Sequence, residues 1–372
     1  MMGGGPDSPA AESKKEVLLV LFPAPESNMA PSLDKIKKKF PKLEVEYVNA
    51  TTTAVWDHEA GIPEDVYERA TIIATVAALP PTPSLAPNLG LIQFFSAGIN
   101  HVMKHPIYTD SKIPLCTATG IHGPQIAEWV ILTTLVQSHG YNDLYEAQKK
   151  HAWKKDNGAG SVRDLPGQRV GVLGYGSIGR QVARVAQALG MDVIAYTASP
   201  RTTPESKKDK GFIVPGTGDP DGSIPSAWYS GTSKEALHAF LKLEIDLLVI
   251  SVPLTPATFH FLSTPEFDLL AASNPNLSYI ANISRGDIID QPALIDALKS
   301  KKLRGAAVDV TSPEPLPEDH PLWEAPNLVL TPHISSNSSR YMERAFQLLE
   351  ANIGKKERGE GLINEVDRKR GY

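Results

Sequence analysis

The sequence predicts an α/β protein with two doubly wound parallel sheets, each covered by helices. Three observations support this fold class. The chain has 372 residues, and one hydrophobic core rarely grows beyond roughly 250–300 residues, so two domains are expected. Short apolar runs alternate with helical segments along most of the chain, which is the pattern of parallel sheets. A glycine-rich turn that starts at Gly174 joins one of these runs to a helical segment.

The first series of elements lies between residues 16 and 95. Strand-like apolar runs cover residues 16–22, 45–48, 71–76 and 90–95, and helical patterns cover residues 33–40 and 63–70. The prolines between residues 80 and 87 predict a loop. Residues 1–15 are rich in glycine, proline and serine, and we expect them to form a disordered tail.

The second series follows a long amphipathic segment, residues 124–151, which can connect two domains. Six strand candidates come after it, at residues 169–173, 192–196, 246–252, 278–282, 305–310 and 327–330. Helical segments link most of them, and a final helix at residues 338–353 would return to the first domain. We therefore expect a first domain of residues 16–139, completed by residues 337–372, and a second domain of residues 140–336.

The glycine-rich turn reads Gly174-Tyr-Gly-Ser-Ile-Gly179. Gly174 permits a tight turn, Gly176 lets backbone amides approach a pyrophosphate, and Gly179 lets the helix pack close to the sheet. The start of the helix adds a dipole that favours an anion. The sequence therefore predicts a Rossmann-like dinucleotide-binding domain. Its expected cofactor-binding residues at the turn are Gly174, Tyr175, Gly176, Ser177 and Ile178.

The end of the next strand distinguishes between the two nicotinamide cofactors. An NAD-specific site usually has an acidic residue about 20 residues after the turn, bound to the ribose 2′-hydroxyl. Here the strand is followed by Thr197-Ala-Ser199-Pro-Arg201-Thr202, without a carboxylate. Arg201 can pair with a 2′-phosphate, to which Ser199 and Thr202 can donate hydrogen bonds. We predict NADP(H) as the preferred cofactor, with NAD(H) possible; the alternative is that Arg201 only caps a surface loop.

Residues 201–237 are rich in glycine, proline, serine and aspartate. The segment is longer than the roughly 2–6 residues usual for connections in such folds. We interpret it as a surface insertion; the alternative is a loop near the adenosine end of the cofactor.

Composition excludes several other classes of protein. Charged residues make up 21% of the chain and the net charge is -5, which does not favour binding to nucleic acid or to an anionic membrane. No apolar run reaches the roughly 18–20 residues that cross a bilayer. Cys116 is the only cysteine, so an intramolecular disulfide and a cysteine-rich metal site are excluded. We expect a cytoplasmic protein without a metal ion.

Three side chains beyond the glycine-rich turn carry the chemistry. They stand in the contexts Ser-Arg285-Gly-Asp, Ser-Pro-Glu314-Pro and Thr-Pro-His333-Ile. A hydride delivered to C2 of a 2-oxo acid leaves charge on the oxygen, so a proton donor is needed. His333 suits this role because imidazole titrates near neutral pH. Glu314 would orient the ring and favour its protonated form, and Arg285 can bind the substrate carboxylate and the developing oxyanion. Taken singly, they could be a capping ion pair, a solvated loop acid and a loop histidine.

The order of these motifs resembles that of the D-isomer-specific 2-hydroxyacid dehydrogenases. This family contains glyoxylate and hydroxypyruvate reductases, phosphoglycerate dehydrogenase and formate dehydrogenase. The resemblance extends from about residue 91 to residue 337, and its matching stretches are residues 95–101, 174–179, 252–255, 282–287, 308–310 and 331–334. It implies a flavodoxin-like substrate domain beside the Rossmann-like domain, with the active site in the cleft between them. In this family the matching glutamate and histidine form a pair.

The resemblance implies roles for further residues. The backbone amides of Ala97 and Gly98 would bind the substrate carboxylate, together with Arg285 and His333. Asp309 would receive the nicotinamide carboxamide. The cofactor cleft would be lined by Val252, Pro253, Thr258 and Ile283. Residues 124–151 resemble the dimer-forming region of the family, so we expect a homodimer. Asn100 replaces an acid often found at its position, and it removes no catalytic group.

These inferences predict an NADPH-dependent reductase of small 2-oxo acids, of the glyoxylate or hydroxypyruvate type, that yields the D-2-hydroxy acid. Formate dehydrogenases place glutamine where this chain has Glu314, so that activity is disfavoured. A phosphoglycerate dehydrogenase-like enzyme stays an alternative. A second alternative is a binding module of the same fold, similar to the nucleotide-sensing transcriptional corepressors. Measuring turnover would distinguish an enzyme from such a binding module.

Overall fold

The computed structural model describes residues 15–50, 62–153 and 162–368. The predicted tail at residues 1–15 therefore lies outside the described residues, except for Lys15. The chain divides into two units, residues 1–119 with 342–372 and residues 120–341. This division differs from the predicted boundary at residue 139, because helix α4 (Gly123–Ser138) shares the hydrophobic core of the second unit.

The first unit contains a five-stranded sheet in the order β2-β1-β3-β4-β5. All of its strand pairs are parallel, as the alternation of strands and helices predicted. The strands are β1 (Val17–Phe22), β2 (Glu44–Asn49), β3 (Ile72–Thr75), β4 (Leu91–Phe94) and β5 (Leu115–Cys116). The helices are α1 (Ala30–Lys39), α2 (Glu64–Arg69), α3 (Pro106–Thr109) and α11 (Tyr341–Glu357). The two-residue strand β5 was not predicted.

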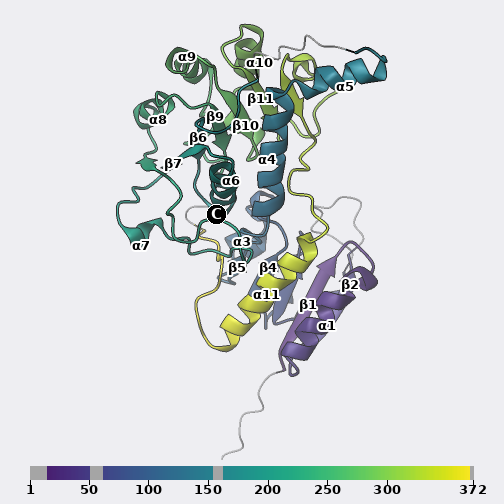
Figure 1. Cartoon of the computed structure of the whole chain (residues 1–372). Coiled ribbons are helices and arrows are strands. Elements are labelled where there is room, and N and C mark those ends of the chain that lie inside the picture. Colours follow the sequence, from purple (N-terminus) through teal and green to yellow (C-terminus); the bar gives the residue numbers. More distant parts are fainter. Residues whose placement is uncertain (1–14, 51–61, 154–161, 369–372) are drawn as a thin grey trace, which may run out of the picture. The chain divides into compact units, whose positions relative to one another are not determined.

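Helix α11 completes the first unit from the other end of the chain (Figure 1). Its Phe346 packs against Phe95, with the ring centroids 5.2 Å apart. Its Asn352, which is fully buried, donates a hydrogen bond of 2.8 Å to Gln93 of β4 and accepts one of 2.8 Å from the backbone of Ile363. A buried amide needs such partners, so these bonds fix the helix on the sheet.

The second unit contains a seven-stranded parallel sheet in the order β12-β11-β10-β9-β6-β7-β8. Its strands are β6 (Arg169–Leu173), β7 (Asp192–Thr197), β8 (Ala227–Ser230), β9 (Leu247–Ile250), β10 (Tyr279–Asn282), β11 (Gly305–Val308) and β12 (Leu328–Leu330). Its helices are α4, α5 (Tyr141–Lys149), α6 (Ser177–Ala188), α7 (Pro204–Lys207), α8 (Lys234–Leu241), α9 (Thr264–Ser273) and α10 (Gln291–Lys299). The order of strands reverses between β6 and β9, which makes their carboxyl ends the place where such sheets bind ligands. Short 3-10 helices cover Glu26–Asn28, Pro83–Leu85, Asn100–Val102, Gly286–Ile288 and Pro321–Glu324.

The predicted long segment at residues 124–151 is divided into two helices, α4 and α5. Between them Gly140 has a φ of 58°, in the left-handed region that glycine adopts without strain. Helix α4 is not amphipathic, because most of its side chains pack within the second unit: Ile126, Trp129, Val130 and Thr133 are all buried. It packs against α6 and against the sheet, where Tyr279 of β10 donates a hydrogen bond to its backbone.

The segment at residues 201–237 is not only a surface insertion, since part of it belongs to the sheet. It contains α7, the strand β8 and the start of α8. Strand β8 pairs in parallel with β7, with Ile194 opposite Ala227. The sequence Ala-Trp-Tyr-Ser was missed because it is short, half-buried and preceded by a long polar stretch. We call residues 198–226, which link the two strands, the β7–β8 connection.

Candidate active site

His333 and Glu314 lie on the loops that follow β12 and β11, and the structure brings their side chains together. Nδ1 of His333 is 2.9 Å from Oε2 of Glu314. The other carboxylate oxygen of Glu314 accepts a hydrogen bond of 3.0 Å from the backbone of Thr311. The carboxylate is therefore oriented by a contact at each oxygen. The two side chains are 45% and 39% exposed, so the outer edge of the imidazole can be reached by a small molecule.

Asp309 holds the loop that carries His333. Its carboxylate is buried and accepts hydrogen bonds from the Thr331 hydroxyl (2.6 Å) and from the backbone amides of Ile334 (2.8 Å) and Ser335 (3.0 Å). Its own carbonyl accepts a bond of 2.8 Å from the amide of His333, whose φ is 55°. These contacts hold a left-handed residue in place. The sequence did not predict this role; the nicotinamide contact of Asp309 stays a prediction.

Arg285 follows β10, on a turn shaped by a buried asparagine. Asn282 donates a hydrogen bond of 3.0 Å to the carbonyl of Arg285 and accepts one of 3.1 Å from the amide of Ser284. The role of Asn282 was also missed, although it begins one of the matching stretches. The Arg285 guanidinium donates to the carbonyl of Ser284 at 2.6 Å. No carboxylate of the described residues forms an ion pair with Arg285. The structure therefore does not support the alternative that Arg285 serves only in a helix-capping ion pair.

The charge of Arg285 is only partly compensated. Burial lowers the pKa of its guanidinium, and the negative charge of Glu314 acts in the opposite direction. Arginine nevertheless remains protonated at every physiological pH. A cation that has lost part of its hydration and has no paired anion is well suited to bind a carboxylate.

The glycine-rich turn has the geometry that its sequence predicts. Gly174 has a φ of 102°, and a Cβ there would lie 2.7 Å from the backbone of Ser251. A Cβ at Gly179 would meet the carbonyl oxygen of Gly174 at 2.3 Å, so the helix packs directly on the turn. Gly176, by contrast, faces open space and is the N-cap of α6 without a side-chain cap. The first amides of Ser177 and Ile178 are therefore not capped by a side chain and suit an anion.

The end of β7 carries the residues expected at the adenosine ribose. Thr197 donates a hydrogen bond of 2.7 Å to the carbonyl of Ser199, and Arg201 donates one of 2.6 Å to the carbonyl of Ser206. Arg201 thus does brace its own loop, which is the alternative interpretation. Within the described part of the chain, however, no carboxylate forms an ion pair with it. Ser199 and Thr202 are exposed.

The remaining predicted cofactor residues lie on the loops that follow β9 and β10. The carbonyl of Val252 accepts a hydrogen bond from the Ser284 hydroxyl, and the carbonyl of Pro253 accepts one of 2.7 Å from Thr258. Ile283, the residue before Ser284, is buried. Because β6, β9 and β10 are adjacent and parallel, these loops share the carboxyl edge of the sheet with the glycine-rich turn.

Ala97 and Gly98 belong to the first unit, on the loop that follows β4. The Ser96 hydroxyl donates a hydrogen bond of 2.9 Å to the carbonyl of Gly98, and Ala97 is exposed. Their contact with the substrate carboxylate stays a prediction.

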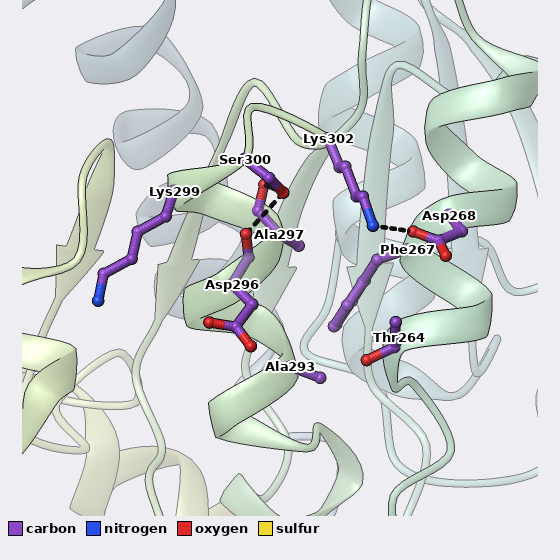
Figure 2. A pocket seen from close by; sticks show the side chains of 9 residues that line it. All are labelled: Thr264, Phe267, Asp268, Ala293, Asp296, Ala297, Lys299, Ser300 and Lys302. Carbon is purple, nitrogen blue, oxygen red and sulfur yellow. Dashed lines mark hydrogen bonds and ion pairs between the residues drawn. The ribbon is translucent and has the colours of Figure 1, made fainter.

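A surface groove of about 520 Å³ lies between α9 and α10, and none of its lining residues was predicted to be functional (Figure 2). Lys302 forms an ion pair with Asp268 across it, while Lys299 points away from that pair (Figure 2). The groove is therefore separate from the predicted site. In the described ranges no three histidine, cysteine or acidic side chains are grouped to hold a metal ion. None of the described helices is long and apolar enough to cross a membrane.

Comparison with known proteins relates the chain to one family. The model named D-isomer specific 2-hydroxyacid dehydrogenase, NAD binding domain, matches residues 131–214 and 223–335. Glyoxylate/hydroxypyruvate reductase A of Salmonella paratyphi B is 30% identical over 300 residues, which cover 79% of this chain and 85% of that protein. The solved structure of an NADPH-dependent glyoxylate/hydroxypyruvate reductase from Sinorhizobium meliloti, in complex with NADP and sulfate, has a TM-score of 0.71 to this chain. The two sequences are 25% identical, and the match covers 96% of this chain and 100% of that chain. A D-isomer-specific 2-hydroxyacid dehydrogenase family protein from Aeromonas salmonicida shares the fold, with a TM-score of 0.71. It is 24% identical, and the match covers 95% of this chain and 99% of that chain.

Gly179→Ala is expected to lower the melting temperature, because the new methyl group would lie 2.3 Å from the Gly174 carbonyl oxygen and 2.8 Å from Val172. Overpacking of this kind costs roughly 1–3 kcal/mol, and each kcal/mol shifts the melting temperature of a domain of this size by about 2–4 °C. Gly176→Ala is the matched control, since a Cβ there meets nothing within 4 Å. Calorimetry in which both variants melt like the wild type would contradict the close packing of α6 on the turn.

Proposed function

Because the chain belongs to the D-isomer-specific 2-hydroxyacid dehydrogenase family, we propose that it reduces a small 2-oxo acid of the glyoxylate or hydroxypyruvate type to the D-2-hydroxy acid, with NADPH as hydride donor. As a member, it is an oxidoreductase that acts on CH–OH groups. The observation that carries the proposal is the hydrogen-bonded pair of Glu314 and His333. Reductases of these two substrates are among its relatives.

His333 is the proton donor in this proposal. Glu314 binds Nδ1 of the ring, so Nε2 is left to face the substrate. As a hydride reaches C2 of the 2-oxo acid, His333 donates a proton from Nε2 to the carbonyl oxygen, and a hydroxyl group results. In the oxidation of a hydroxy acid the same nitrogen accepts the proton. Glu314 holds the ring in one orientation through its contact with Nδ1.

Arg285 binds the substrate carboxylate. Its guanidinium is half-buried and has no carboxylate partner among the described residues, so a substrate anion would compensate its charge. The planar fork can also contact the carbonyl oxygen while negative charge develops on it, which lowers the barrier. Lysine would not supply this two-point geometry.

The residues around the glycine-rich turn fit a nicotinamide dinucleotide. The uncapped start of α6 and the open space at Gly176 fit a pyrophosphate, and Arg201 offers a cation for a 2′-phosphate. When bound, the dinucleotide supplies the hydride. A preference for NADPH is supported by the absence of an acidic residue between Thr197 and Thr202 and by the bound NADP named for the Sinorhizobium relative.

A homodimer through residues 124–151 is also part of the proposal. Exposed apolar side chains occur on α4, on α5 and shortly after α5: Leu132 (59% exposed), Tyr141 (53%), Tyr145 (46%) and Trp153 (90%). Large exposed aromatic residues in one region mark interaction sites. A second copy of the chain is the partner that the resemblance implies. The cytoplasmic location inferred from Cys116 stays a prediction.

The reaction is tested with a panel of 2-oxo acids and NADPH, followed by the loss of NADPH absorbance. The wild type is expected to turn over glyoxylate or hydroxypyruvate, and His333→Ala to lose about 10²–10⁴-fold in kcat, because proton transfer contributes an effect of that size. NADPH binding should be retained in this variant. His320→Asn is the control, because asparagine preserves the N-cap that His320 forms on a neighbouring 3-10 helix.

A wild type that is inactive with every acid would favour the binding module over the enzyme. Full activity in His333→Ala would exclude this histidine as the proton donor.

The cofactor preference is tested with Arg201→Ala, assayed with NADPH and with NADH. Charge-assisted hydrogen bonds contribute about 1.5–3 kcal/mol, so KM for NADPH should rise by about 10- to 100-fold while KM for NADH stays unchanged. Lys208→Ala, in the same loop, removes an exposed cation that pairs with Glu205 and serves as the control. A wild type with a higher kcat/KM for NADH, or an equal effect of Arg201→Ala on both cofactors, would contradict the preference.

Sedimentation equilibrium tests the dimer. The wild type should sediment as a dimer, and Trp153→Ala should weaken the association by about 30-fold or more, because a buried tryptophan at an interface contributes about 2 kcal/mol or more. Trp323→Ala, which removes an aromatic ring that is 50% exposed elsewhere, should leave the association unchanged. A monomeric wild type would show that residues 124–151 do not bind a second copy.

A further inference from the structure

The β7–β8 connection contacts the glycine-rich turn through Asp219. Asp219 is 3% exposed, and its Oδ2 accepts a hydrogen bond of 2.8 Å from the hydroxyl of Tyr175, the residue between Gly174 and Gly176. The same carboxylate accepts bonds from the backbone amides of Ser223 (3.0 Å) and Ile224 (3.2 Å). Each of its oxygens is therefore engaged, and one of its partners is a side chain of the turn.

Arg180, on the first turn of α6, fastens the same connection to the helix. Its guanidinium is 4% exposed and donates to the carbonyls of Asp219 (2.5 Å) and Lys207 (2.6 Å). Its Nε is 3.5 Å from a carboxylate oxygen of Asp209. The guanidinium also lies over the ring of Tyr175, 5.0 Å from the centroid. A buried charge with this many contacts holds both segments in one arrangement.

Three further contacts extend the attachment. Gln181 accepts a hydrogen bond of 2.6 Å from the amide of Gly218, and Arg184 donates one of 3.2 Å to the carbonyl of the same glycine. The ring of Tyr175 packs edge-on against Trp228 of β8, with the centroids 4.9 Å apart. The connection is thus bonded to the turn and to three residues of α6.

The glycine-rich turn needs such support for a physical reason. Glycine has more backbone freedom than any other residue, so Gly174 and Gly176 leave Tyr175 as the first side chain that can anchor the turn. A site that is ordered before binding avoids the entropic cost of ordering when the ligand arrives. Asp219 lies between the two stretches that match the family model, so the anchor comes from a part of the chain outside the matched residues.

We propose that Asp219 is a positioning residue for the dinucleotide site: it holds Tyr175 and Arg180 so that the backbone amides at the start of α6 are prearranged for the pyrophosphate. This inference rests on the proposed role of the glycine-rich turn. It adds a residue that contacts neither substrate nor cofactor and acts through the turn. Because the pyrophosphate is common to both cofactors, the effect is the same for NADPH and NADH.

Isothermal titration of the full-length protein with NADPH and with NADH tests the proposal. Asp219→Asn should weaken the binding of both dinucleotides by about tenfold, which corresponds to about 1.4 kcal/mol, and should leave kcat at saturating NADPH unchanged. Tyr175→Phe removes only the hydroxyl, so it should act in the same direction with a smaller effect. The double variant should bind the dinucleotides as weakly as Asp219→Asn does, because both substitutions remove the same hydrogen bond between Tyr175 and Asp219. Asp221→Asn, an exposed aspartate in the same connection, is the control.

Three results would overturn the proposal. Wild-type affinities in Asp219→Asn and Tyr175→Phe, with a lower melting temperature, would assign Asp219 to stability alone. A loss confined to NADPH would place the effect at the 2′-phosphate and not at the turn. A wild type that binds neither dinucleotide would overturn the proposed function as well, whereas the first two results leave that function standing.

Discussion

The buried carboxylate of Asp309 joins the end of β11 to the loop that follows β12, and the position of His333 depends on it. A carboxylate buried in this way is costly unless it is hydrogen-bonded, and here three donors from residues 331–335 satisfy it. The loop is thereby held around a left-handed residue, His333, whose imidazole reaches Glu314 on the neighbouring loop. Without these bonds the ring would have no fixed orientation, and neither a proton transfer nor a selective contact with a carbonyl oxygen would be efficient.

The rest of the site follows from the order of strands in the second sheet. Strands β6, β9, β10 and β11 are adjacent and parallel, so the loops after them meet at one edge of the sheet. The glycine-rich turn, Arg285 and Glu314 come from three of these loops. Arg285 is partly desolvated, and no carboxylate among the described residues forms an ion pair with it. It lies close enough to Glu314, which binds the imidazole, for the negative charge of that glutamate to act on it. In the proposed function, Glu314 also distinguishes the chain from formate dehydrogenases, whose reaction requires no proton donor for a carbonyl oxygen.

Local sequence patterns predicted a large part of this architecture, because a buried parallel strand and a glycine turn leave a signal within a few residues. Strand β6, the turn after it and helix α6 are examples. Strand β8 was missed because its four residues carry no such signal, and the assignment of α4 to the second unit depends on packing against α6. The pairing of Glu314 with His333 came from the family resemblance. The partners of Asp309 and Asp219 could not be predicted, since the Thr331 hydroxyl and the Tyr175 hydroxyl are 22 and 44 residues away in the sequence, and only the fold brings them into contact.

The central claim is that His333 gives its proton to the carbonyl oxygen of a 2-oxo acid while Glu314 holds the ring. A crystal structure with NADPH and an unreactive 2-oxo acid analogue, such as oxamate, tests it most directly. The account predicts Nε2 of His333 within about 2.6–3.2 Å of the oxygen that stands for the carbonyl, Nδ1 still bound to Glu314, and the analogue's carboxylate on Arg285. An analogue bound away from His333, or an imidazole turned from Glu314 in the complex, would contradict it.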